Sequence, residues 1–411
     1  MAIIKPFRAV RATRDKVALV SSKSYEVYAP KKLQAKLNFN PYTFLHVINP
    51  GYKYNQDTSG EQKFKLVHNR YLEFKETGVF TKDENAAFYI YQKTTPKETF
   101  CGIIAATSVE DYNNDVIKKH EGTLQKRELL FEDYLKNTGF NAEPVLLTYP
   151  DTPNIKSIID KHKQERAEYE FTTTDKNSHL LWIVDNEEDI NTIVDEFQKI
   201  DALYIADGHH RSSSSCLLAK HKSEENPNHT GNEDYNFFMS YLIPESELKI
   251  SEFNRFITDL NGLKTDEFLI ALDEHYRIEN HGQILYTPSK KHHFSMYLNG
   301  EFYSLYLRKT SYILSDPLSK LDPEILYRTI LKPILGIIDL KNSSRISYIY
   351  NKKDSLILKR KVDSGNFKVA FGMVPLSIEE IKEIADANLQ MPPKSTYIHP
   401  KMRSALTIYE F

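Results

Sequence analysis

Short apolar runs alternate with amphipathic stretches along the whole chain. Apolar runs of about four to eight residues predict buried strands, and apolar positions three or four residues apart predict helices that cover a sheet. The strands predicted in this way are 44–48, 86–91, 100–108, 145–149, 180–184, 203–206, 237–244, 293–297, 302–307, 346–350 and 367–374. The predicted helices are 31–40, 63–78, 187–200, 266–276 and 378–388, with further helices that end at Gly139 or begin at Arg211 and Asp322. This order of elements predicts an α+β fold with a mixed sheet.

The segment from Leu203 to Leu217 combines a buried strand, a sharp turn and the beginning of a helix. Its sequence is LYIADGHHRSSSSCL. The Asp207-Gly208 dipeptide favours the turn, because glycine has no Cβ that would clash at a positive φ. The backbone N–H groups and the dipole of the helix then point at whatever lies over the turn, and Arg211 adds a guanidinium. The pattern favours a phosphate-bearing ligand, with a purely structural helix cap as the alternative.

The composition is that of an ordinary globular protein without a strong electrostatic field. The chain has 411 residues, of which 40% are hydrophobic and 27% are charged, and its formal net charge is -2. This balance does not favour nucleic acid as a partner, and no apolar run approaches the ~20 residues of a membrane span. The two cysteines, Cys101 and Cys216, are too few for a disulfide framework. We therefore expect a cytoplasmic location and no membrane partner.

The polar segment Lys222–Asp234, KSEENPNHTGNED, is the most linker-like part of the chain. It predicts a first region, residues 1–221, that carries the central junction, and a second α+β region, residues 235–411. Neither G-x-G-x-x-G nor the Walker pattern G-x-x-x-x-G-K-[ST] occurs in the sequence. Their absence argues against both standard nucleotide-binding folds.

Two further polar stretches do not follow the hydrophobic pattern. The first is Lys119–Thr123, KHEGT, and the second is Lys394–Thr396, which prolines enclose on both sides. A solvated loop is the structural alternative for the first stretch, and a rigid C-terminal turn is the alternative for the second. If these stretches and the Asp207 turn are walls of one site, both regions contribute to the same cleft.

Four ordered motifs give the chain a resemblance to a known family. They are KPFRAVR near the N-terminus, KHEGT followed by KR, IADGHHR, and MPPKSTYIHPK near the C-terminus. In this order and at these distances they resemble the DUF1015 family over essentially the whole chain. That family is similar to the ParB/sulfiredoxin-like superfamily, whose members place nucleotide phosphates on a glycine turn at a helix N-terminus. Within it, proteins with a similar D-G-H-H-R turn are free serine kinases, which make O-phospho-L-serine.

The resemblance implies a nucleotide-binding core and a kinase that transfers phosphate from ATP or ADP to free L-serine or a similar hydroxy amino acid. The implied catalytic residues are Glu26, His120 and Glu121, and the implied nucleotide-binding residues are Asp207, Gly208, His209, His210, Arg211 and Ser212. Lys394, Ser395 and Thr396 are expected to bind either the transferred phosphoryl group or the carboxylate of the amino acid, and Mg²⁺ is expected at carboxylates such as Asp207 or Glu121. The sequence departs from the family at Lys23–Val27, KSYEV, where many members resemble P-P-Y-D-V. The alternative function is that of a nucleotide-binding regulator without catalysis.

Overall fold

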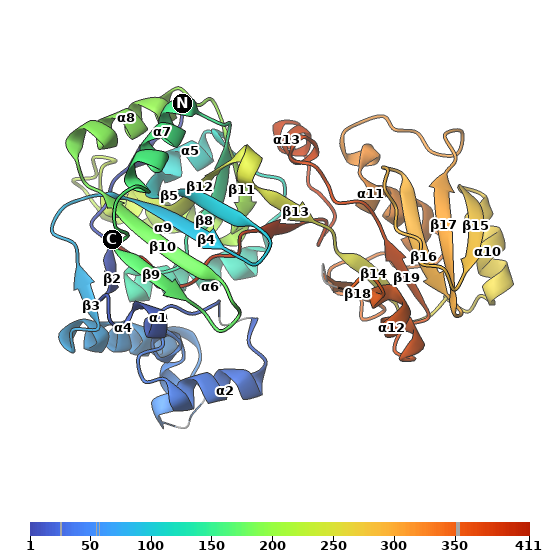
Figure 1. Ribbon diagram of the computed structural model, residues 1–411, viewed down its shortest axis with the longest axis horizontal. Coiled ribbons are helices and arrows are strands. Elements are labelled where there is room, and N and C mark those ends of the chain that lie inside the picture. The colour runs from blue at the N-terminus through green and yellow to red at the C-terminus, as the bar shows by residue number, and fades with distance from the viewer. Residues whose placement is uncertain (25–26, 55, 57, 351–353) are drawn as a thin grey trace. The chain divides into compact units, whose positions relative to one another are not determined.

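The computed structural model describes residues 1–24, 27–54, 56, 58–350 and 354–411, and these residues form two compact units (Figure 1). Unit 1 comprises Met1–Lys118, Thr123–Leu248 and Pro400–Phe411. Unit 2 comprises Lys119–Gly122 and Lys249–His399. Each unit has its own sheet and its own hydrophobic core.

Unit 1 is built on a sheet with the strands β1 (Ile4–Lys5), β4 (Phe88–Thr94), β5 (Thr99–Ser108), β6 (Ile117–Lys118), β8 (Val145–Tyr149), β9 (Tyr169–Thr172), β10 (Ser178–Val184), β11 (Leu203–Asp207) and β12 (Phe237–Pro244). The order is β6-β11-β8-β12-β5-β4-β10-β9, with β1 paired to β5. β11 runs parallel to β6 and β12 runs parallel to β8, whereas the other neighbours are antiparallel. The predicted α+β fold with a mixed sheet is confirmed.

The helices of unit 1 are α1 (Val17–Val20), α2 (Pro30–Phe39), α3 (Leu45–Ile48), α4 (Gly60–Glu76), α5 (Val109–Asn113), α6 (Gln125–Thr138), α7 (Pro153–His162), α8 (Glu187–Gln198) and α9 (His209–Glu225). α7 and α8 bury Ile155, Ile159 and Phe197 in the core on one face of the sheet. Two small ladders join β2 (Val10–Ala12) to β3 (Phe80–Lys82) and β7 (Phe140–Asn141) to β21 (Tyr409–Glu410). The strand predicted at 44–48 is wrong, because this run forms the short helix α3.

Unit 2 is built on an antiparallel sheet with the order β15-β17-β16-β19-β14-β18. Its elements are β13 (Lys249–Ser251), β14 (Asn254–Ile257), α10 (Thr265–Asp273), β15 (Tyr276–Gly282), β16 (His293–Leu298), β17 (Glu301–Leu307), α11 (Asp322–Leu326), a π-helix (Tyr327–Leu331), β18 (Ile346–Ile349), α12 (Ile357–Asp363), β19 (Val369–Gly372), α13 (Ile378–Asp386) and β20 (Tyr397–His399). Side chains alternate between the two faces of a strand. Accordingly Ile257 lies in the core that α10 and α11 cover, and its neighbour Phe256 lies in the core that α12 covers.

The bounds of the two units differ from the predicted regions 1–221 and 235–411. β12 belongs to unit 1, because it inserts between β5 and β8 in the sheet. The segment Pro400–Phe411 also belongs to unit 1, where β21 pairs with β7. Within the residues described, no helix is sufficiently long and apolar to cross a membrane.

Candidate functional site

The strand β11, the Asp207-Gly208 turn and the helix α9 form the junction that the sequence predicts. Gly208 has a φ of 103° and occupies the N-cap position of α9, without a side-chain capping hydrogen bond. A Cβ at Gly208 would lie 3.1 Å from Cζ of Arg211, so the turn and the guanidinium pack closely. The first N–H groups of a helix have no partner within the helix, and they carry the positive end of its dipole. The junction therefore has the geometry that favours an anion.

Asp207 lies between two cationic side chains. Nη2 of Arg211 donates to Oδ2 of Asp207 at 2.7 Å, and Nζ of Lys401 donates to Oδ1 at 2.6 Å. Nη1 of Arg211 donates to the carbonyl of Pro144, which fixes the guanidinium at both ends. Burial raises the pKa of Asp207, but the charges of Lys401 and Arg211 lower this pKa by more, so the carboxylate stays ionised. Asp207 thus holds two cations beside the N-terminus of α9.

The histidines and serines after the turn have mostly internal roles. The His209 side chain is buried, and burial lowers its pKa to about 4, so the imidazole is neutral. Ser212 is fully buried, and its hydroxyl donates to the carbonyl of Gly208 at 3.0 Å. The hydroxyl of Ser215 likewise donates to the carbonyl of Arg211 at 2.9 Å. Serines in helices often bond to the carbonyl four residues earlier, and the hydroxyl proton of Ser212 is used in this way.

Ser213 contacts a different element of unit 1. Its hydroxyl donates to Oε1 of Glu128, near the beginning of α6. The hydroxyl of Thr123, the last residue of the KHEGT motif, donates to the same oxygen. The Glu128 carboxylate therefore joins the end of one predicted polar stretch to the first turns of α9.

The geometry at Asp207 does not fit the metal that the sequence predicts there. Both carboxylate oxygens already accept hydrogen bonds from Arg211 and Lys401. In the part of the chain that the structure describes, no group of three or more His, Cys, Asp or Glu side chains is arranged to hold a metal ion. Glu121, the other predicted ligand, is exposed. We therefore assign Asp207 the role of orienting Arg211 and Lys401 rather than that of a metal ligand.

In unit 2, the first part of the KHEGT motif packs beside the beginning of the MPPKST motif. The carbonyl of His120 accepts a hydrogen bond from the backbone N–H of Met391 at 3.0 Å. A Cβ at Gly122 would lie 2.3 Å from Oε1 of Gln390, so a side chain at this position would require Gln390 to move. His120 is 1% exposed. The structure thus brings two of the three predicted polar stretches together.

The predicted substrate residues form a tight turn within unit 2. Lys394 has a φ of 57°, and its ammonium lies 5.6 Å from the centroid of the Phe253 ring. Ser395 is buried, and its hydroxyl donates to the carbonyl of Pro392 at 2.7 Å. Thr396 is half-buried. Glu26, the predicted base, lies outside the described residues, and the expected convergence of all three stretches on one cleft stays a prediction.

The C-terminal segment of unit 1 brings cations to this site that the sequence pattern does not predict. Lys401 reaches Asp207, and its own carbonyl accepts a hydrogen bond from Nζ of Lys93 at 2.8 Å. Nε of Arg403 donates to the hydroxyl of Ser21 at 3.1 Å. Lys401 is the last residue of the MPPKSTYIHPK motif and Arg403 follows it, so the motif was the available signal, but it does not show which element Lys401 contacts.

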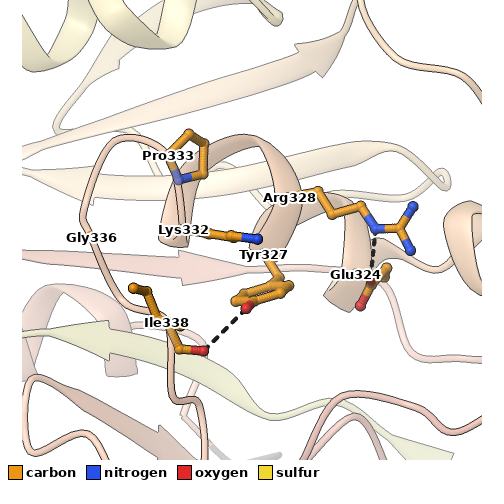
Figure 2. A pocket seen from close by; sticks show the side chains of 7 residues that line it. All are labelled: Glu324, Tyr327, Arg328, Lys332, Pro333, Gly336 and Ile338. Carbon is orange, nitrogen blue, oxygen red and sulfur yellow. Dashed lines mark hydrogen bonds and ion pairs between the residues drawn. The ribbon is translucent and has the colours of Figure 1, made fainter.

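Unit 2 also has an open pocket beside its π-helix (Figure 2). It is lined by Glu324, Tyr327, Arg328, Lys332, Pro333, Gly336 and Ile338. Nε of Arg328 donates to Glu324 at 2.6 Å, and the hydroxyl of Tyr327 donates to the carbonyl of Ile338 at 3.1 Å. None of the residues that the sequence predicts for function lines this pocket.

Solved structures with some likeness to the chain include proteins bound to nucleotides. C-terminally truncated SbnI from Staphylococcus aureus has a TM-score of 0.39 and 13% identity, covering 74% of this chain and 87% of that chain. Free serine kinase in complex with AMP has a TM-score of 0.32 and 14% identity, covering 71% of this chain and 89% of that chain. A mutant free serine kinase in complex with ADP has a TM-score of 0.34 and 13% identity, covering 76% and 95%. At TM-scores below 0.5, these likenesses establish neither the fold nor the activity of this chain.

The match to a sequence family is more extensive. No curated protein matches the chain significantly. The family described as "Protein of unknown function (DUF1015)" matches residues 4–324, which include the KHEGT motif and the Asp207-Gly208 turn. The chain belongs to the DUF1015 family.

Proposed function

We propose that this chain is a small-molecule kinase, which transfers a phosphate from ATP or ADP to free L-serine or a similar hydroxy amino acid. One observation carries the proposal: Gly208 opens α9 at a positive φ while Arg211 and Lys401 are both held by Asp207 beside it. A helix N-terminus with two fixed cations is suited to a phosphate chain. The resemblance of the D-G-H-H-R turn to that of free serine kinases, and to the ParB/sulfiredoxin-like superfamily, supports the same assignment.

Phosphoryl transfer depends mainly on positioning and on the stabilisation of charge. In this proposal the N–H groups at the beginning of α9 bind phosphate oxygens, and Arg211 and Lys401 neutralise the negative charge that the transferred group carries. Asp207 holds the side chains of Arg211 and Lys401 in place before the ligand binds. Binding therefore does not have to restrict the conformations of these two side chains. Glu26 remains the proposed base for the acceptor hydroxyl, with His120 and Glu121 as further catalytic candidates.

The proposal is tested by incubating the protein with ATP or ADP and L-serine, and by measuring O-phospho-L-serine by mass spectrometry. Nucleotide should also raise the melting temperature, because it binds the folded state. Arg211→Ala should remove most of this shift and most of the product. Arg308→Ala, which removes an exposed ion pair to Asp273 in unit 2, is the matched control and should change neither.

Three outcomes are informative. Product from the wild type and loss of product in Arg211→Ala support the kinase. A nucleotide-dependent rise in melting temperature without any phosphorylated product, across a mixture of hydroxy amino acids, supports the regulator instead. An unchanged response to nucleotide in Arg211→Ala contradicts the assignment of the Gly208 turn as the phosphate site.

A further inference from the structure

A second group of polar side chains lies in unit 1 on the strands β4 and β10. Lys93 and His179 are directly opposite each other in the antiparallel pairing of these strands, so their side chains lie on the same face of the sheet. The carbonyl of Lys401 accepts from Lys93 at 2.8 Å. Arg403 follows two residues later and donates to the backbone carbonyl and the hydroxyl of Ser21. Three segments that are distant in sequence therefore bring two cations and a histidine together.

Neither Lys93 nor Arg403 has a direct carboxylate partner among the described residues, and Asp175, whose charge acts on both, is paired with Lys23. Lys401 pairs with Asp207, and Lys23 pairs with Asp175 at 2.8 Å. Among the described residues, neither Lys93 nor Arg403 has a carboxylate oxygen within 4.0 Å. Their hydrogen bonds go instead to neutral oxygens of Lys401 and Ser21.

Lys93 and Arg403 are half-buried, and this burial disfavours their charged forms. Burial lowers the pKa of Lys93 to about 8, and it lowers the pKa of Arg403 as well. Such shifts mean that the charged forms lose hydration that their neutral partners do not fully replace. A negatively charged ligand would replace it.

His179 adds an unsatisfied polar atom to the same group. It is 1% exposed, its Nδ1 lies 2.7 Å from the hydroxyl of Tyr91, and its Nε2 is buried without a hydrogen-bond partner within the described structure. Burial and the nearby charges of Arg403 and Lys93 lower its pKa to about 3, so the ring is neutral. We assign the proton to Nε2, with the Tyr91 hydroxyl donating to Nδ1, because this hydroxyl has no other acceptor among the described residues; Nε2 is then a donor. Buried polar atoms normally have partners, and this donor lacks one.

We infer that Lys93, His179 and Arg403 form a second anion site in unit 1, which binds the carboxylate of the amino-acid acceptor. The identity of the acceptor rests on the proposed function, whereas the anion site itself rests on the residues above. Lys401 connects the two sites, because its backbone carbonyl contacts Lys93 and its ammonium contacts Asp207.

Calorimetric titration of L-serine and of L-serinamide, which lacks the carboxylate, tests the site in the full-length protein. The wild type should bind L-serine more tightly than L-serinamide. Lys93→Met and Arg403→Gln should each weaken L-serine binding by roughly tenfold or more, because each removes a charge-assisted hydrogen bond to a carboxylate. Lys93→Arg, which keeps the charge, should retain binding, and Lys97→Met, at an exposed lysine beyond β4, is the matched control.

The ligand-free melting temperature separates loss of binding from loss of folding. It should be unchanged or higher in Lys93→Met, because the variant removes a poorly compensated cation, and the response to ADP should persist. Equal binding of serine and serinamide by the wild type, or serine binding by Lys93→Met at wild-type strength, would overturn the acceptor assignment.

Inorganic phosphate distinguishes a failure of the anion site from a failure of the kinase proposal. In an Arg211→Ala background the Gly208 site is weakened, so remaining phosphate binding reports on the second site. Loss of that binding on adding Arg403→Gln supports the anion site even if no serine is phosphorylated. The second anion site is contradicted if the wild type does not bind serine and the Arg211→Ala variant, still melting cooperatively, does not bind phosphate.

Discussion

At the scale of single residues, Asp207 and Asp322 show how the surroundings of an aspartate set its protonation state. Asp207 is ionised because Lys401 and Arg211 contact its two oxygens. Asp322, at the beginning of α11 in unit 2, is fully buried, and only its Oδ1 has a partner, the backbone N–H of His292 at 2.8 Å. Its Oδ2 is buried without a partner among the described residues, and burial raises its pKa to about 7.

We predict that Asp322→Asn stabilises unit 2 at alkaline pH. The folded-state pKa of about 7 lies above the ordinary value of an aspartate, so the folded state keeps its proton longer than the unfolded state. The stabilising contribution is complete below about pH 4 and is lost as the pH rises through 7, by up to about 1.4 kcal/mol per pH unit. Urea unfolding at pH 4 and pH 8, followed by hydrogen exchange in β16, should show a gain for the variant only at pH 8.

The matched control for this prediction is Asp273→Asn. The Asp273 side chain is 64% exposed and pairs with Arg308, so its removal should change little at either pH. An Asp322→Asn variant that is less stable than the wild type at pH 8 would show that the carboxylate is ionised and stabilising, contrary to the prediction.

At the scale of elements, the local junctions could be predicted from the sequence and the long-range pairings could not. The apolar run 203–206 followed by Asp207-Gly208 identifies β11 and the beginning of α9, because the signal is contained in a few residues. The apolar run 44–48 was wrongly predicted as a strand, because a run of this length fits a short helix equally well. The insertion of β12 between β5 and β8 depends on contacts between distant segments, which no local pattern records.

The same limit applies to the candidate site. Asp207 and Arg211 could be predicted because they lie within one motif. Lys93, Lys401 and Arg403 could not, because they come from a strand and from the C-terminal segment, and only the folded sheet brings them together. Single lysines and arginines in a sequence are usually solvated, so composition does not distinguish those that line a site.

We predict that Gly208→Ala abolishes the response to nucleotide. The φ of 103° disfavours any residue with a Cβ, and this Cβ would lie 3.1 Å from Cζ of Arg211. The backbone alone should cost on the order of 1–2 kcal/mol. Gly262→Ala in unit 2 is a matched control, because its φ is 80° but nothing lies within 4 Å of the added Cβ. Both variants should lower the melting temperature, but only Gly208→Ala should lose the ADP-dependent shift; equal shifts would show that the turn is not the phosphate site.

At the scale of the whole molecule, the chain leaves unit 1 after Leu248 and returns to it at Pro400. The returning segment makes contacts along its length: Lys401 with Asp207, Ser404 with Ser22, Ile408 with Val10, and β21 with β7. Near its end, Glu410 accepts hydrogen bonds from Tyr71 at 2.7 Å, Lys75 at 2.6 Å and Lys82 at 2.8 Å. Unit 1 is therefore completed only by residues that follow unit 2 in the sequence.

We predict that deletion of residues 400–411 destabilises unit 1 and leaves unit 2 folded. The deletion removes a strand pairing, the Lys401–Asp207 ion pair and the carboxylate whose loss leaves Tyr71 without its partner. Hydrogen exchange should become faster in β7, β11 and α4, while exchange in β16 and β19 stays at the wild-type rate.

Glu410→Gln is the graded control: burial raises the pKa of Glu410, but Lys75, Lys82 and Tyr71 lower it to about 2, so at neutral pH the substitution removes a charge held by two lysines. Glu410→Gln should speed hydrogen exchange in α4 and leave both the exchange of β11 and the ADP-dependent rise in melting temperature unchanged. A truncated chain whose unit 1 exchanges at the wild-type rate would show that residues 400–411 are dispensable for its stability.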